Sequence, residues 1–77
     1  MEDEKYVGTV CWFNSNLGYG FIEHFIGGVK QEDLFVHFSD ISSEGFRTLY
    51  KEQKVSYNVG LNKRGLPKAT DVIVLKQ

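Results

Sequence analysis

The sequence predicts an all-β fold, a small barrel of about five strands. Hydrophobic residues recur with period two in short runs bounded by turn-forming residues, and no window shows the 3.6-residue periodicity of an amphipathic helix. Length is the third observation. A flat sheet of such short strands could not bury a core within 77 residues, so the sheet must curl until it closes or nearly closes on itself.

The first three strands are predicted in the N-terminal half of the chain. The first runs from Lys5 to about Phe13 and ends at a turn-rich cluster, Asn14–Asn16. The second runs from Gly18 to about Phe25 and stops near the glycine pair at 27–28. The third covers Leu34 to Ser39.

The C-terminal half supplies two more strands. A longer connection over residues 40–53 is expected to hold a short helical turn near Ser42 or Thr48. In the fourth strand, residues 54–61, the apolar side chains alternate with polar ones. The apolar set is Val55, Tyr57 and Val59, and the polar set is Lys54, Ser56 and Asn58. A basic turn over residues 62–68 then leads to the fifth strand, residues 69–76.

Composition restricts the class of protein. The chain is long enough for one small domain, residues 1–77, whose acidic residues 1–4 are expected to form a solvated tail. Its single cysteine, Cys11, cannot form an internal disulfide, and no Cys/His cluster has the spacing of a zinc site. The sequence shows neither a secretory signal nor a membrane-spanning stretch, so we expect a cytoplasmic protein without a metal.

Charge restricts the kind of partner. A net charge of -1 argues against a protein that grips duplex nucleic acid mainly through phosphate contacts. Aromatic residues make up 14% of the chain, which offers another source of binding energy, although small cores also use aromatic residues.

The second predicted strand alternates glycine with aromatic residues. Glu23 shares a face with Tyr19 and Phe21, whereas Ile22 shares the other face with Gly18 and Gly20. Because burying an unpaired carboxylate costs several kcal/mol, Glu23 should face water together with both rings. The glycines then face the interior, where the absence of a side chain lets a tightly curled strand bend.

The third strand gives the same result independently. Its aliphatic residues Leu34 and Val36 are expected in the core, which leaves Phe35 and His37 on the outer face. The opposite arrangement stays open, with the rings in the core and the glycines facing solvent, because periodicity cannot exclude a one-residue inversion. That arrangement would also bury Glu23 and His37.

A row of exposed rings on a sheet is suited to stacking unpaired bases, which predicts a single-stranded RNA or DNA partner. Catalysis is not expected. His37 has no nucleophile or carboxylate partner in a recognisable motif, and Cys11 lacks a setting that would lower its pKa. We expect Cys11 to be exposed and His24 to be a polar residue near a loop, without a role in a site.

Two segments resemble the bacterial cold-shock proteins and the cold-shock domain. They are "GTVCWFNSNLGYGFI" and "DLFVHFSDI", followed by "GFRTL", and the match spans nearly the whole chain. The resemblance implies an antiparallel Greek-key barrel of the OB-fold type that binds single strands. It also implies a binding face formed by Trp12, Phe13, Tyr19, Phe21, Phe35, His37, Phe38 and Phe46.

Two members of this implied face disagree with the period-two pattern. Trp12 shares a strand face with Val10, which has the character of a core residue, and Phe38 shares one with Val36. If both rings are to reach the surface, the first strand needs a β-bulge near Trp12 and the third must end near Phe38.

The chain also departs from the family where phosphate contacts are expected. Cys11 and Leu17 stand where the family usually has basic residues, and the "RGLPKA" turn is one residue longer than the family pattern. Basic residues remain elsewhere, and of these Arg64 and Lys68 are the predicted phosphate contacts. The others are Lys30, Arg47 and Lys63.

We therefore expect a monomeric binding module that takes pyrimidine-rich single strands and needs no cofactor. The resemblance implies an RNA chaperone or regulator of the cold-shock type. The alternative is a small β-barrel interaction module whose aromatic patch docks a peptide. Neither function involves a membrane or a small-molecule substrate.

Overall fold

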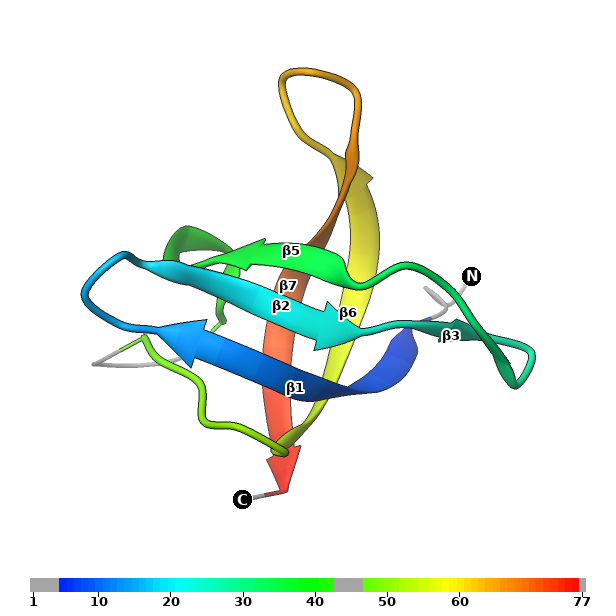
Figure 1. The fold of residues 1–77 in the computed structure, drawn as a ribbon, viewed down its shortest axis with the longest axis horizontal. Helices are drawn as coiled ribbons and strands as arrows, with labels where there is room; N and C mark the ends of the chain where they lie inside the picture. Colours follow the sequence, from blue (N-terminus) through cyan, green and yellow to red (C-terminus); the bar gives the residue numbers. More distant parts are fainter. Residues whose placement is uncertain (1–4, 43–46, 77) are drawn as a thin grey trace.

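The computed structural model describes residues 5–42 and 47–76. Strands in the order β1, β2, β5, β7, β6 form a closed barrel, and β3 and β4 form a separate two-stranded sheet beside it (Figure 1). The elements are β1 (Tyr6–Asn14), β2 (Tyr19–Glu23), β3 (Phe25–Ile26), β4 (Val29–Lys30), β5 (Leu34–His37), the 3-10 turn η1 (Phe38–Asp40), β6 (Lys54–Leu61) and β7 (Pro67–Lys76). The predicted all-β barrel is confirmed.

The barrel closes through one parallel pair. β1 pairs with β2 and β6, β2 with β5, and β6 with β7, all antiparallel. β5 and β7 run parallel and pair at Phe35 and Lys68, and a parallel bridge between Ile41 and Val72 extends this contact. The expected antiparallel arrangement therefore holds for every pair but the one that closes the barrel.

Several predicted boundaries are corrected. The second strand ends at Glu23, and after His24 the chain continues into the β3–β4 hairpin, which the sequence pattern did not indicate. A helical turn lies at Phe38–Asp40, before the position expected, whereas Ser42 and Thr48 are not helical, and residues 43–46 lie outside the described part of the chain. β7 begins at Pro67, so the basic turn is shorter than expected. The predicted bounds of β6 are confirmed.

The core lies inside the barrel and has the aliphatic composition that the alternation predicts. Its buried hydrophobic residues are Val10, Ile22, Leu34, Val36, Ile41, Leu49, Val55, Tyr57, Ala69 and Val72. β6 departs from strict alternation, because its pairing with β7 shifts register between Ser56 and Asn58. Ser56, a member of the polar set, is buried, and Val59, a member of the apolar set, is 39% exposed.

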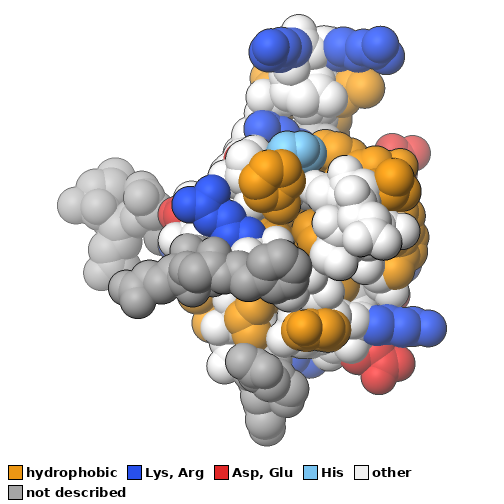
Figure 2. Space-filling model, turned by 90° about the vertical axis from the view of Figure 1, so that its left-hand side faces the viewer, with side chains coloured by type: hydrophobic (Ala, Val, Ile, Leu, Met, Phe, Trp, Pro, Cys, Tyr) orange, Lys and Arg blue, Asp and Glu red, His pale blue; other side chains and the backbone are white. Residues whose placement is uncertain are grey.

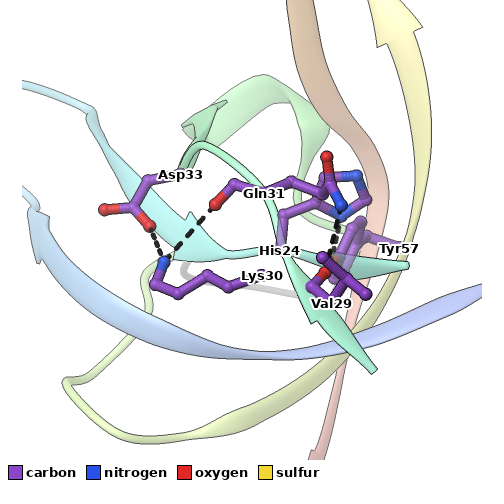
Figure 3. A network of polar contacts seen from close by, with 6 residues as sticks. All are labelled: His24, Val29, Lys30, Gln31, Asp33 and Tyr57. Atoms are coloured by element: carbon purple, nitrogen blue, oxygen red, sulfur yellow. Dashed lines mark hydrogen bonds and ion pairs between the residues drawn. The ribbon is translucent and has the colours of Figure 1, made fainter. Parts of the chain in front are cut away.

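A histidine–tyrosine pair occupies one end of the core. His24 is 6% exposed, and its Nδ1 lies 2.9 Å from the Tyr57 hydroxyl (Figure 3). Burial lowers the pKa of His24 and raises the pKa of Tyr57 to about 12. A Cβ at Gly8 would overlap the Glu23 carbonyl oxygen and lie 3.1 Å from the Tyr57 ring, so this approach needs glycine. His24 is therefore a buried structural residue, not the loop-side polar residue expected.

Within residues 5–42 and 47–76, helical structure of the length and hydropathy needed to cross a bilayer is absent.

Candidate nucleic-acid interface

A β-bulge in β1 turns Trp12 outward. Val10 pairs with Ile22, but Trp12 pairs with Phe21, so Cys11 is an extra residue between two consecutive pairs. Val10 is 1% exposed and Trp12 is 43% exposed, although both have the same parity in the sequence. The bulge inferred from the resemblance is thus confirmed. The same shift sends Phe13 toward the interior, where it is half-buried and packs against the core.

Three rings form a row across three adjacent strands. Trp12 on β1 lies opposite Phe21 on β2, which lies opposite Phe35 on β5. The ring centroids are 5.3 Å apart in the first pair and 5.9 Å apart in the second. Tyr19 lies beside this row, 5.9 Å from Trp12 and 5.5 Å from Phe35, and pairs with His37.

These rings lie outside the core and cover one another only in part. Tyr19, Phe21 and Phe35 are half-buried, whereas Ile22 and Leu34, which follow Phe21 and precede Phe35 in the chain, are buried. The alternative with the rings inside the barrel is therefore excluded. Glycine is required on the inner side, because a Cβ at Gly20 would overlap the carbonyl oxygen of Trp12.

Phe38 reaches the surface because β5 ends before it. Phe38 opens η1, is 44% exposed and lies 4.6 Å from the His37 ring between centroids. Its N–H donates to the Gly18 carbonyl at 2.8 Å, and Gly18 has a φ of 85°. The expected strand end is confirmed. We call Trp12, Tyr19, Phe21, Phe35, His37 and Phe38 the aromatic face.

His37 is held in place by its own turn. Its Nδ1 accepts a hydrogen bond from the Ser39 backbone N–H at 3.2 Å and lies 2.9 Å from the Ser39 hydroxyl. Because Nδ1 acts as an acceptor, the proton of the neutral ring is on Nε2. The histidine therefore adds a positioned N–H donor to the aromatic face.

The predicted cationic residues differ in how they are held. Lys68 Nζ lies 3.1 Å from an Asp40 carboxylate oxygen, and both side chains are largely shielded from solvent. Arg64 is exposed in the turn between β6 and β7, where Asn62 Oδ1 accepts from the N–H groups of Arg64 and Leu66. In Figure 2 basic side chains stand at the tip of this hairpin, beyond the hydrophobic side chains and the histidine on the barrel below. Phe46 lies outside the described residues.

Cys11 is less accessible than expected. The bulge leaves it half-buried, and burial, reinforced by the nearby Asp33 carboxylate, raises the pKa of its thiol. A protonated thiol is a poor nucleophile. The site therefore offers stacking surface and hydrogen-bond donors, and Cys11 adds no activated nucleophile to it.

Sequence reasoning missed a concavity beside the aromatic face. It has a volume of about 660 Å³ and extends from Phe21 and Phe35 to the turn between β6 and β7, where Leu66 and Pro67 line it. The one signal in the sequence was the "RGLPKA" segment, which departs from the pattern that the resemblance implies.

Comparison with known proteins gives a consistent result. The family model described as the 'Cold-shock' DNA-binding domain matches residues 6–75. The cold shock-like protein CspA of Vibrio cholerae is 47% identical over 72 residues, which cover 94% of this chain and 97% of that protein. CspA of Shewanella violacea is 48% identical over 75 residues, 97% of this chain and all of that protein. Cold shock domain-containing protein 4 of Arabidopsis thaliana is 49% identical over 65 residues, which are 31% of its length.

Proposed function

The chain belongs to the cold-shock domain family, and on this premise we propose that it binds single-stranded RNA or DNA by stacking unpaired bases on the aromatic face. The observation that carries the proposal is the row of Trp12, Phe21 and Phe35, which places rings on three neighbouring strands of one rigid barrel. Each stacked base contributes about 1 to 3 kcal/mol, whichever base it is.

Stacking explains how a chain with a net charge of -1 can hold a polyanion. The charge of Lys68 is neutralised by Asp40, which leaves exposed Arg64 as the better phosphate contact of the two predicted. Phosphate contacts then guide the strand along the barrel, and the rings supply most of the affinity.

The same geometry gives the protein a preference for unpaired strands. Duplex bases are already stacked on each other and cannot lie against Trp12 or Phe35. Binding to the open form alone shifts a weak hairpin toward that form by mass action. This is the activity of an RNA chaperone, which we propose for a monomeric, cytoplasmic protein acting on pyrimidine-rich transcripts.

Trp12 is the chain's single tryptophan and lies within the aromatic face, so its fluorescence reports on stacking directly. We expect a short oligothymidine to quench this fluorescence at micromolar concentration and a duplex of the same length to leave it unchanged. Equal quenching by the duplex would contradict stacking. If neither ligand changes the fluorescence of Trp12, the peptide-docking alternative is favoured.

A further inference from the structure

The concavity beside the aromatic face has the size and the walls of a ligand site. Its volume of about 660 Å³ falls in the range of small-molecule pockets. Phe21 and Phe35 belong both to its lining and to the aromatic row, so the concavity continues the face at the end where β5 begins. A strand lying on the rings would deliver its next base to this space.

One wall comes from the turn between β6 and β7 and the first residue of β7. Leu66 and Pro67 line the concavity, and Leu66 is 55% exposed. The turn is rigid, because Asn62 Oδ1 accepts from the Leu66 N–H at 3.0 Å and the Asn62 N–H donates to the Leu66 carbonyl at 2.8 Å. These bonds hold the Leu66 backbone, and its side chain adds an apolar surface to a lining that also includes the two phenyl rings.

Another part of the lining is acidic. Glu32 and Asp33 line the concavity immediately before β5. Asp33 is paired with Lys30 at 3.0 Å (Figure 3), whereas Glu32 is exposed and forms no ion pair within residues 5–42 and 47–76. Carboxylate oxygens can only accept hydrogen bonds at neutral pH, so this wall suits a donor and repels a phosphate.

We propose that this concavity is a subsite for one base that carries an exocyclic amino group, such as cytosine, with Leu66 and the phenyl rings holding the base plane and Glu32 accepting from the amino group. The proposal rests on the single-strand binding proposed above. Uracil and thymine present a carbonyl oxygen where cytosine presents its amino group, and an oxygen facing Glu32 would be repelled. The aromatic face stacks all bases with little preference. The subsite would add one position at which cytosine is distinguished from uracil and thymine.

The test compares strands that differ in a single base edge. An oligodeoxyuridine of about eight nucleotides is titrated against variants in which one deoxycytidine is moved along the strand position by position. We expect cytosine at one position to tighten binding about tenfold relative to uracil, the effect of one good hydrogen-bond pair. At the other positions the exchange should change affinity little.

Variants then assign the effect to the two walls. Glu32→Gln should abolish the cytosine advantage, because an amide can donate to uracil as well as accept from cytosine. Glu52→Gln, a matched control on an exposed glutamate outside this lining, should keep the advantage. Leu66→Ala should weaken binding of both strands, and Leu61→Ala, on an exposed leucine of the same hairpin outside the lining, should not.

The proposed subsite is overturned if the cytosine advantage persists in Glu32→Gln, or if cytosine confers no advantage at any position. In either case the oligodeoxyuridine itself would still bind. Failure of the oligodeoxyuridine itself to bind would instead count against the proposed function, so the two outcomes are distinguishable.

Discussion

Phe21 and Phe35 lie directly opposite each other on β2 and β5, with their rings nearly perpendicular at 77° and their centroids 5.9 Å apart. Edge-to-face contact is a favoured arrangement of aromatic rings and stabilises each in its rotamer. Because Ile22 and Leu34 occupy the interior beside them, neither ring can turn inward without displacing the core. The two rings therefore form a surface that is in place before a ligand arrives.

Removing a ring should weaken single-strand binding far more than removing a lysine. Phe35→Ala and Phe21→Ala each delete a stacking surface worth about 1 to 3 kcal/mol, so the dissociation constant for oligothymidine should rise about 5- to 150-fold. Lys68→Ala should cost less, since Asp40 already neutralises this lysine. The measurement is quenching of Trp12. A larger loss in the lysine variant than in either ring variant would make charge the principal source of affinity.

Binding should depend only weakly on salt. Each phosphate contact on a single strand contributes about -0.7 to the slope of log K against log salt concentration, so two or three contacts predict a slope of roughly -1.4 to -2.1. Titrations with oligothymidine at several salt concentrations measure this slope. A slope of about -5 would require many more phosphate contacts than a stacking-dominated site uses.

Stability should fall in mild acid because of His24. Burial lowers the pKa of this histidine below its ordinary value of 6.5. As the pH falls through 6.5, His24 becomes protonated in the unfolded chain while it stays neutral in the folded chain. The free energy of unfolding therefore decreases. The contribution is fully present above 6.5 and is lost progressively below it. Urea unfolding at about pH 7.5 and about pH 5 should show this difference.

His24→Gln provides the matching control, since an amide can accept from or donate to the Tyr57 hydroxyl but does not titrate. The free energy of unfolding in this variant should depend less on pH over the same interval. An unchanged dependence would mean that other groups, such as carboxylates, cause the loss of stability in acid.

Gly20→Ala should destabilise the barrel. The added Cβ would overlap the Trp12 carbonyl oxygen and lie 2.9 Å from the Phe13 ring, so β1 and β2 would have to separate. Overpacking of this kind costs about 1 to 3 kcal/mol in the free energy of unfolding.

Gly60→Ala is the milder comparison, because its Cβ would lie 3.1 Å from the Thr70 methyl group and would overlap no backbone atom. Urea denaturation measures both variants. Equal losses of stability would show that the close approach of β1 to Gly20 is not what requires glycine there.

The alternation and the cost of burying Glu23 predicted which faces of β2 and β5 point outward, and the burial of Ile22 and Leu34 confirms this choice over the inverted arrangement. The reason is local: strands alternate with period two, and the cost of burying Glu23 decides between the two orientations of Tyr19 and Phe21. The same alternation predicted Leu34 and Val36 in the core. These features needed no knowledge of which strand lies next to which.

The alternation could not predict the features that depend on pairing between distant residues, and these came from the three-dimensional structure. The register of β1 against β2 places the bulge at Cys11, turning Trp12 outward and Phe13 toward the core, and the shift between β6 and β7 exposes Val59. His24 contacts Tyr57, which lies 33 residues later in the chain. The alternation within one strand carries no information about the register of its neighbour, because register is set by how the whole barrel closes.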